Sequence, residues 1–342
     1  MMKAPAPSHI RKLIALAFLL AALLLANLYF GSVHIPAAAI TDLLLGGEAE
    51  RVSWSYILWE NRIPQAFTAM FSGAGLAAAG LLLQTLFRNP LAGPSILGID
   101  GGANLGVAIA MLLLGGSFMA GTFSLSGFLL VIVAAMAGAW GILLLLIAFS
   151  HWLRSNTLLL ITGVMIGYLT SSMISLLNYG ATEEGVRSFM VWGLGSFANV
   201  TVDRLPAFII TMSVGIGCAL LLIKPLNALL LGDNYATNLG VNVKRTRTFL
   251  LFTTGLLTAT STAFCGPIAF IGLAVPHLAR LQLGTSDHSA LLPATLLTGA
   301  CLALTCNLIS TVPYSTLIPI NVITPILGAP VVIWVILTMR KG

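Results

Sequence analysis

Hydrophobic stretches long enough to cross a lipid bilayer follow one another along almost the whole chain. A transmembrane α-helix needs about 20 predominantly apolar residues, and ten stretches of the sequence meet this requirement. They are 12–31, 64–84, 96–115, 123–149, 157–179, 205–223, 248–265, 267–283, 290–312 and 320–339. The sequence therefore predicts an all-α integral membrane protein in which residues 1–342 form a single domain, a bundle of about ten transmembrane helices.

The scarcity of charge excludes an ordinary soluble protein. Charged residues make up 8% of the chain and hydrophobic residues 58%, whereas a soluble domain carries roughly 25% charged residues. The first apolar stretch, 12–31, follows a basic start, as in a signal peptide. It is longer than the 7–15 residues of a signal-peptide core and lacks a convincing cleavage site, so we expect it to be helix one.

The basic residues are distributed unevenly between alternate loops, and this sets the expected orientation. One set of loops and termini holds Lys3, Arg11, Lys12, Arg88, Arg154, Lys224, Lys244, Arg245, Arg247, Arg280, Arg340 and Lys341, and the other set holds Arg51, Arg62, Arg187 and Arg204. Loops rich in Lys and Arg stay in the cytoplasm. Both termini are therefore expected to be cytoplasmic, and the net charge of +6 does not indicate a nucleic-acid partner.

The longest cytoplasmic loop, 224–247, contains a candidate partner-binding element. Asp233 is a plausible N-cap of a short helix that runs to Leu239, and Gly240 is its plausible stop. A short helix on the cytoplasmic face suits a protein that binds a partner there. An ordinary solvated connector fits the pattern equally well.

Asp100 is the one acidic residue expected inside the membrane boundary. An intramembrane carboxylate is a functional candidate by default, and Asp100 could relay a proton in a transporter driven by an ion gradient. It also lies near the cytoplasmic start of a helix and within reach of Arg88. Helix capping or pairing with Arg88 is the favoured interpretation.

Other polar residues admit a functional and a structural interpretation. Asn89, Ser155 and Asn156 lie at the inner ends of two predicted helices, where they could form a gate or cap the helices. Arg62, Arg187 and Arg204 belong to the outer surface, as interfacial anchors or as docking points for an acidic partner. Cys218, Cys265, Cys301 and Cys306 lack CxxC spacing and are expected to be packing residues.

No catalytic or metal-binding pattern stands out. The chain lacks a GxxxxGK[ST] loop for ATP, a GxSxG motif and an HExxH motif. His277 precedes Arg280 by three residues, but no second ligand stands at metal-binding spacing. A membrane enzyme is therefore disfavoured, and a transporter of this kind takes its energy from a partner ATPase or from an ion gradient.

Four short strings break the hydrophobic pattern with Gly, Pro and polar residues. They are RNPLAGPSILG at 88–98, GDNYATNLGVNVKR at 232–245, GPIAFIGLAVPHLAR at 266–280 and PILGAPVVIWVIL at 325–337. Broken helices at membrane depth are tolerated only where protein hides them or where they line a cavity. This arrangement favours a transport protein.

From about Arg62 to residue 342 these strings resemble the FecCD family, the permeases of ABC importers for iron siderophores, haem and cobalamin. The resemblance implies a multi-pass permease of the bacterial inner membrane, without ATPase activity of its own. Two cytoplasmic ABC ATPase subunits would bind the ATP and Mg²⁺, a periplasmic or lipid-anchored binding protein would deliver the cargo, and a second permease copy would complete a homodimer. The resemblance leaves the cargo open among these chelates.

The resemblance also assigns roles to residues. Residues assigned to ATPase coupling are Gly232, Asp233, Asn234, Tyr235, Ala236, Leu239 and Gly240, and those assigned to a cytoplasmic gate are Asn89, Leu91, Ser155 and Asn156. Gly266, Pro267, Gly272, Pro276, His277 and Arg280 form the most specific motif, and Arg62 would meet a carboxylate on the binding protein, with Arg187 and Arg204 as further docking candidates.

The chain departs from the family pattern at several positions. Gln65 replaces a second docking arginine, and Asp233-Asn234 replaces a common pair of glutamates. Asp100 stands where a small polar residue is usual, and Leu317-Ile318-Pro319 replaces an acid-Leu-Pro sequence. The first and last departures bear on the contacts expected with the binding protein.

Overall fold

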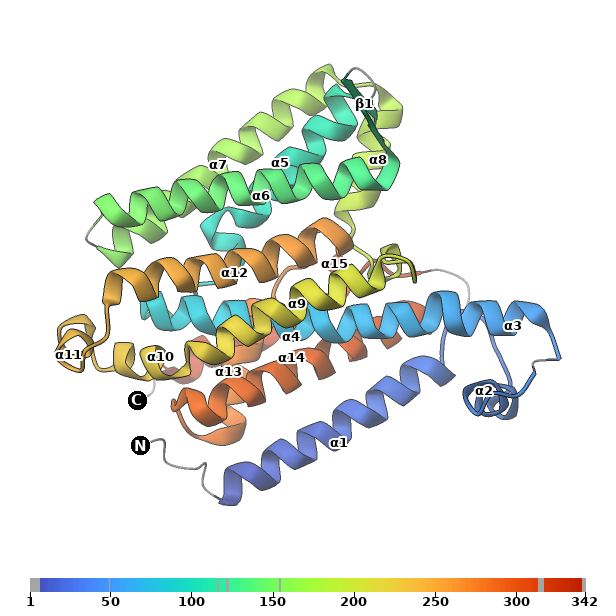
Figure 1. Ribbon diagram of the computed structural model, residues 1–342, viewed down its shortest axis with the longest axis horizontal. Helices are drawn as coiled ribbons and strands as arrows, with labels where there is room; N and C mark the ends of the chain where they lie inside the picture. The colour runs from blue at the N-terminus through green and yellow to red at the C-terminus, as the bar shows by residue number, and fades with distance from the viewer. Residues whose placement is uncertain are drawn as a thin grey trace.

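The computed structural model describes residues 7–48, 50–115, 117–120, 123–153, 155–312 and 317–339, and these are almost entirely helical (Figure 1). The longer helices are α1 (Pro7–Tyr29), α4 (Ile63–Phe87), α6 (Gly127–Trp152), α7 (Asn156–Gly180), α9 (Leu205–Leu221), α12 (Val243–Cys265), α14 (His288–Thr311) and α15 (Ile320–Met339). The shorter helices are α2 (Ala37–Leu44), α3 (Val52–Tyr56), α5 (Ile99–Ala108), α8 (Glu183–Gly193), α10 (Ile223–Leu230), α11 (Asp233–Asn238) and α13 (Ile271–Leu283). The remaining elements are the π-helical segments η1 (Ile57–Arg62) and η3 (Ile109–Leu113), the 3-10 turns η2 (Pro94–Leu97) and η4 (Phe197–Asn199), and an antiparallel hairpin of β1 (Ser117–Ala120) and β2 (Phe123–Ser126).

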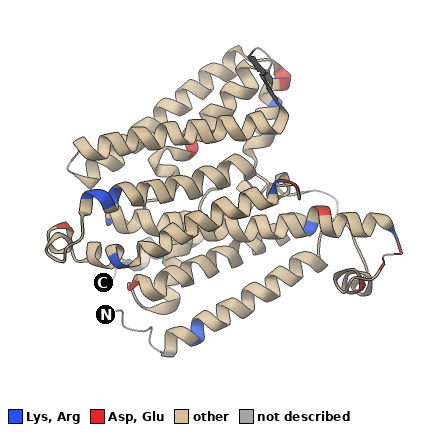
Figure 2. Cartoon of the chain, in the orientation of Figure 1, with Lys and Arg blue, Asp and Glu red and all other residues tan. Residues whose placement is uncertain are grey.

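The bundle has two distinct ends (Figure 1). The end that carries α10, α11 and the start of α1 is called the α11 end below. The end that carries α2, α3, α8 and the hairpin is called the α8 end. Lys and Arg gather mainly at the α11 end, while Asp and Glu are more frequent at the α8 end (Figure 2). The long helices between the two ends are nearly free of charge.

Each of the ten predicted stretches contains at least one helical segment, although 96–115 is divided among η2, α5 and η3 and 123–149 begins on β2. Among the described residues, six helices are long and apolar enough to cross a membrane, and the bent pair α9–α10 raises this number to seven. The helices α5–η3 and α15 are apolar but shorter. The all-helical membrane fold is thus confirmed, apart from the hairpin, and about ten crossings stays a prediction.

Helix α4 lies at the centre of the bundle and packs against α9, α12, α13 and α14. Small residues allow these helices to approach one another closely. A Cβ atom added at Gly80 would lie 1.7 Å from the carbonyl oxygen of Gly272 on α13, and one added at Gly73 would lie 2.3 Å from that of Gly299 on α14. A side chain at either position would therefore separate the helices.

Burial distinguishes inner from outer helices. The apolar window is 83% buried in the helix that contains α4, but 11% buried in α1 and 17% in α7. Helix α12 has the lowest hydropathy of the candidate spans and is 78% buried, so its Thr and Ser side chains are shielded from lipid. The exposed apolar faces of α1 and α7 fit a lipid environment or a further protein surface.

The predicted helix breaks are present. Arg88 ends α4 in the left-handed conformation at φ 46°, and Phe270 begins α13 in the same region at φ 67°. Gly266 has a φ of 77°, which glycine adopts without steric cost. Two of the four strings, 88–98 and 266–280, therefore interrupt helices and expose backbone groups inside the bundle.

The second membrane helix begins earlier than its predicted stretch, 64–84. The helix begins at Val52 and continues without interruption to Phe87. Pro64, the first residue of the predicted stretch, lies inside this helix, two residues after the π-helical turn Ile57–Arg62. A wider π-helical turn accommodates the missing proline N–H and the bulk of its ring.

Candidate functional site

The segment predicted to couple to an ATPase forms a short helix at the α11 end. Asp233 is the first residue of α11 and is not its N-cap, because the cap position belongs to Gly232 at φ 114°. Gly240 has a φ of 81° and follows the end of the helix, as predicted. Tyr235 and Leu239 are 52% and 58% exposed, so α11 presents an apolar surface to its surroundings.

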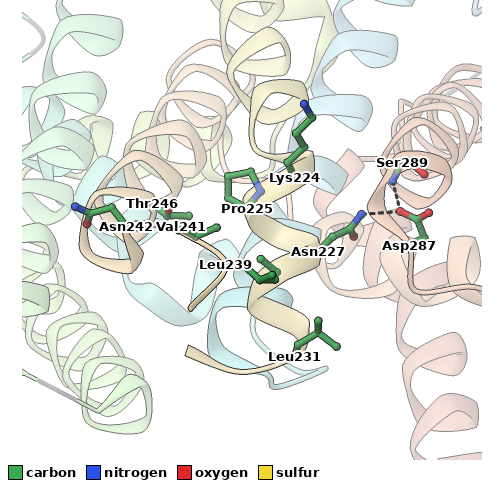
Figure 3. A pocket seen from close by; sticks show the side chains of 12 residues that line it. Lys224, Pro225, Asn227, Leu231, Leu239, Val241, Asn242, Thr246, Asp287 and Ser289 are labelled. Atoms are coloured by element: carbon green, nitrogen blue, oxygen red, sulfur yellow. Dashed lines mark hydrogen bonds between the residues drawn. The ribbon is translucent and has the colours of Figure 1, made fainter. Parts of the chain in front are cut away.

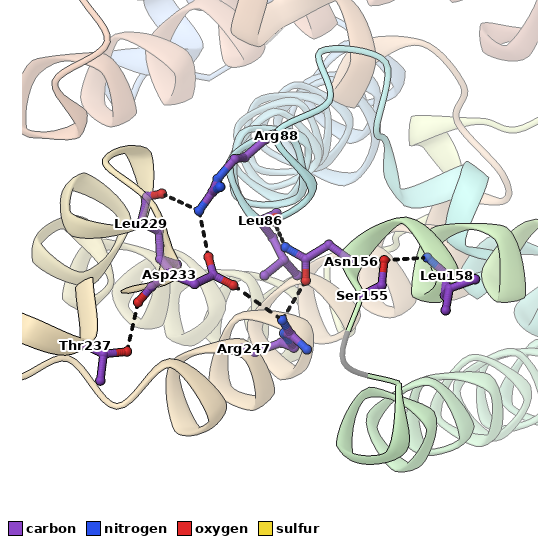
Figure 4. Close-up of polar contacts among 9 residues, drawn as sticks. All are labelled: Leu86, Arg88, Ser155, Asn156, Leu158, Leu229, Asp233, Thr237 and Arg247. Atoms are coloured by element: carbon purple, nitrogen blue, oxygen red, sulfur yellow. Dashed lines mark hydrogen bonds and ion pairs between the residues drawn. The ribbon is translucent and has the colours of Figure 1, made fainter. Parts of the chain in front are cut away.

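Asp233 is free of a capping role and points to two arginines (Figure 4). Arg88 Nη2 donates to Asp233 Oδ1 at 2.7 Å and to the carbonyl oxygen of Leu229 at 3.3 Å. Arg247 Nη2 lies 3.9 Å from Asp233 Oδ2. The predicted partner of Arg88 was Asp100, and the structure corrects this: the left-handed turn at the end of α4 directs Arg88 to α11.

Asn156, a predicted gate residue, joins the same cluster (Figure 4). Arg247 Nη2 donates to Asn156 Oδ1 at 2.6 Å, and Asn156 Nδ2 donates to the carbonyl oxygen of Leu86 at 2.8 Å. Arg88, Asn156, Asp233 and Arg247 therefore connect the end of α4, the start of α7, the start of α11 and the first turns of α12. We call these four residues the Asp233 cluster.

The other predicted gate residues lie close by in sequence but outside this cluster. Ser155 caps α7 by accepting from the backbone N–H of Leu158 at 3.4 Å. Asn89 accepts from the N–H of Leu91 at 2.9 Å in the loop after α4. Leu91 is 39% exposed. These contacts are local turns and caps, so a gating role for the three residues stays a prediction.

A pocket of about 900 Å³ lies beside α11 and is lined by α10, the segment after α11 and the start of α14 (Figure 3). Asn227 Nδ2 donates to Asp287 Oδ1 at 2.7 Å, and the N–H of Ser289 donates to the same oxygen at 2.9 Å. Partial burial raises the pKa of Asp287, but the hydrogen bonds from Ser289 and Asn227 outweigh this, so its pKa lies below the ordinary value. Leu239 lines the opposite wall of this pocket.

The string 266–280 forms part of the packing between α13 and α4. Its members Gly266, Pro267, Gly272, Pro276, His277 and Arg280 occupy the break before α13 and α13 itself. His277 Nε2 donates to the carbonyl oxygen of Pro90 at 2.8 Å, and Arg280 Nη1 donates to Gln84 Oε1 at 2.7 Å. In the described part of the chain no three His, Cys, Asp or Glu side chains gather as a metal site would require.

Asp100 is held by two hydroxyl groups. Ser95 Oγ donates to Asp100 Oδ2 at 2.6 Å, and Thr262 Oγ1 donates to Asp100 Oδ1 at 3.0 Å. The carboxylate thereby joins the turn η2 and the end of α12 to α5. A pocket of about 460 Å³ adjoins it, lined also by α7 and the segment 267–269.

The structure corrects the position expected for Arg62 at the α8 end. Its side chain is 6% exposed, and its guanidinium donates to the carbonyl oxygens of Leu28, Tyr29 and Val33. Arg187 is exposed, and Arg204 lies 4.3 Å from the ring centroid of Phe128. Of the predicted docking residues, Arg187 is therefore exposed and Arg62 is buried.

Sequence reasoning missed Arg88, Arg247 and Asn227 as members of the polar contacts at the α11 end. Arg88 begins the string 88–98, and Arg247 lies two residues after the end of the string 232–245. Arg88 was expected to pair with Asp100 instead, and Arg247 was counted only as a cytoplasmic charge. A basic residue next to a Gly/Pro string at a helix end is the sequence signal that could have predicted these polar contacts between helix ends.

Comparisons with known proteins agree with this arrangement. The family model described as the FecCD transport family matches residues 19–338. The Vitamin B12 import system permease protein BtuC of Klebsiella pneumoniae is 36% identical over 331 residues, which cover 96% of this chain and 94% of that protein. The protein of the same name in Citrobacter koseri is 37% identical over 287 residues, or 83% of this chain and 84% of that one.

A solved structure extends the likeness to three dimensions. It is described as an inward-facing conformation of a metal-chelate type ABC transporter. It superposes with a TM-score of 0.82 at 29% sequence identity and covers 96% of this chain and 98% of that one. The family match spans nearly the whole chain and is joined by relatives above 30% identity, so this chain belongs to the FecCD transport family.

Proposed function

We propose that this chain is the membrane permease subunit of an ATP-driven importer that carries a metal chelate into the bacterial cytoplasm. The family match and the relatives named for vitamin B12 import support a cobalamin-type cargo first. Iron siderophores and haem are the alternatives within the family. The observation that carries the proposal is the match to the FecCD family over residues 19–338.

The proposal places the α11 end in the cytoplasm, at the inner membrane. Loops rich in Lys and Arg remain on that side of a membrane, and the described basic residues gather mainly there (Figure 2). The exposed Tyr235 and Leu239 on α11 would then contact a cytoplasmic ABC ATPase subunit. Two such subunits bind ATP and Mg²⁺, and this chain is a transport subunit without an ATPase site.

Further partners follow from the same assignment. A periplasmic or lipid-anchored binding protein would deliver the cargo at the α8 end, where Arg187 is exposed and acidic residues are frequent. A second copy of the permease would cover one of the exposed apolar faces, of which α7 carries a long one, with Ile161, Met165 and Tyr168 at 49%, 53% and 67% exposure. The chelate would cross between the two copies.

The Asp233 cluster supplies a physical route from the ATPase contact to the gate. A displacement of α11 moves Asp233, which contacts Arg88 at the end of α4 and Arg247 on α12. Arg247 also holds Asn156 at the start of α7. The ends of three helices thus receive the movement through side chains, and the cytoplasmic mouth opens or closes as those ends separate or approach.

The alternative function, a gradient-driven transporter that uses Asp100, gains no support from the comparisons. Both Asp100 oxygens accept hydrogen bonds from hydroxyl groups of neighbouring elements. A carboxylate fixed in this way serves as a structural link between α5, η2 and α12.

Reconstitution tests the proposal directly. Proteoliposomes would hold this chain with its ATPase subunits, and the binding protein would be added outside with labelled cobalamin, haem or a ferric siderophore. We expect uptake that requires internal ATP and is highest for cobalamin. Uptake by the chain alone, driven by a proton gradient, would overturn the proposal, and ATP-dependent uptake of another chelate would correct the cargo.

A further inference from the structure

A groove on the outside of the bundle lies between the end of α6 and the start of α12. It has a volume of about 570 Å³. The side chains that form it include Ile147, His151, Lys244, Arg245, Phe249 and Phe252. It is separate from the pocket beside α11, and the proposed function assigns no role to it.

The chemistry of the groove changes along its length. Lys244 and Arg245 stand in the first turn of α12, and His151 stands in the last turn of α6. Phe249 and Phe252 follow one to two turns further along α12, and Ile147 lies one turn before His151. A helix rises 1.5 Å per residue, so the basic rim and the far aromatic wall are about 12 Å apart. This matches the step from a lipid headgroup to the upper part of its acyl chains.

Among the described residues, no carboxylate lies within ion-pair distance of Lys244 or Arg245 at the rim. In the part of the chain that the structure describes, both ion pairs use Asp233, and neither includes Lys244 or Arg245. Arg247 points to the other side of α12, to Asn156 and Asp233 (Figure 4). An anion is therefore the ligand that complements this rim.

The surroundings of the groove are those of a surface that faces lipid. Helix α6 has the highest hydropathy of the candidate spans and is only 33% buried. Leu144 and Leu145 are 60% and 48% exposed, and Trp152 at the end of α6 is 79% exposed. Exposed tryptophan at a helix end marks the membrane–water interface. The ring of Phe252 packs against that of Trp140 in a tilted arrangement, with the ring centroids 5.2 Å apart, which fixes the inner wall.

We propose that this groove binds one anionic phospholipid of the membrane leaflet at the α11 end. The phosphate contacts Lys244 and Arg245, and an acyl chain lies along Phe249 and Phe252. Basic pockets between membrane helices bind anionic headgroups in this way. The bound lipid braces the first turns of α12, from which Arg247 reaches the Asp233 cluster. The site depends only on the chain's residence in a membrane and not on the identity of its cargo.

The experiment uses the purified full chain in nanodiscs of phosphatidylcholine with increasing phosphatidylglycerol, and native mass spectrometry counts the retained lipids. The double variant Lys244→Gln/Arg245→Gln is compared with Arg11→Gln/Lys224→Gln, which removes two basic charges from the same end outside the groove. Each basic contact strengthens anionic lipid binding about fivefold. We therefore expect the affinity for phosphatidylglycerol, obtained from the titration, to fall about 25-fold in the first variant and less than twofold in the second.

A second measurement needs no variant. A photoactivatable phosphatidylglycerol with the reactive group on the upper acyl chain should label the segment that contains Phe249 and Phe252. Equal loss of phosphatidylglycerol in both double variants would overturn the proposal, because lipid binding would then depend on the total surface charge and not on the groove. Equal retention of phosphatidylcholine and phosphatidylglycerol by the unmodified chain, or labelling confined to other helices, would overturn it as well.

Discussion

Two buried arginines stand at opposite ends of the bundle, and their partners differ in kind. Arg62, at the α8 end, is 6% exposed and donates to backbone carbonyl oxygens at and after the end of α1. Arg247, at the α11 end, is 9% exposed and contacts the side chains of Asn156 and Asp233 on two other helices. Carbonyl groups move only with their backbone, whereas side-chain partners can be exchanged. Arg62 therefore fastens a fixed corner, and Arg247 has the exchangeable contacts that the proposed coupling of α11 to α7 and α12 requires.

The largest expected effect is the loss of Arg62. Arg62→Met leaves several buried carbonyl groups without their donor, and each unpaired buried group costs about 1–3 kcal/mol. We expect the free energy of unfolding to fall by about 3 kcal/mol, with transport reduced in proportion to the folded fraction. Thermal unfolding in detergent measures the change in stability. The matched control is Arg187→Met on the exposed surface, which should change stability by less than about 0.5 kcal/mol.

The same substitution can also contradict the structural role given to Arg62. If Arg62→Met folds as stably as the unmodified chain but no longer binds its delivering protein, Arg62 is a docking residue after all. The carbonyl contacts would then belong to a resting state of the side chain.

Arg247 should behave differently, since its substitution is expected to affect transport more than folding. Arg247→Lys keeps the charge but loses the planar guanidinium that reaches Asn156 and Asp233 together. We expect ATP-driven uptake to fall about tenfold, with a loss of stability of about 1 kcal/mol, while the ATPase subunits continue to hydrolyse ATP. The control is Arg11→Lys, at an exposed arginine of α1 that belongs to no proposed site. Equal losses of uptake in both variants would show that the contacts of Arg247 with Asn156 and Asp233 do not contribute to transport.

Substitution of Asp233 tests the same contacts between α11, α4 and α12, with a smaller expected effect on uptake. Its ion pair with Arg88 is 42% to 49% exposed, and exposed pairs contribute about 0–1 kcal/mol to stability. Asp233→Asn should therefore leave unfolding nearly unchanged and lower uptake about threefold. A double-mutant cycle with Arg88→Gln would measure the coupling in uptake between the two residues. Strictly additive losses would mean that Asp233 and Arg88 act separately.

The comparison also shows what the sequence could predict. Helix positions and the breaks at 88–98 and 266–280 follow from hydrophobic length and from Gly and Pro, which act locally. The burial of Arg62 depends on where the carbonyl groups at the end of α1 come to lie, a contact that spans 34 residues. The pairing of Arg88 depends on its left-handed backbone, which turns it from Asp100 to Asp233. Such contacts over long sequence distances carry no local pattern, and the assigned gate and coupling roles stay predictions.

The smallest expected effect concerns Asp287, which fastens α10 to the start of α14 beside the Asp233 cluster. Hydrogen bonds from Ser289 and Asn227 lower its folded-state pKa below the ordinary value of 3.8, although burial acts in the opposite direction. The unfolded chain therefore binds this proton more readily, and the stabilisation is present above about pH 4 and lost as pH falls through the folded pKa. In Asp287→Asn the melting temperature should fall less steeply below pH 4, by about 2 °C or less. An unchanged slope would mean that the contacts of Asp287 with Asn227 and Ser289 are too exposed to stabilise this end of the bundle.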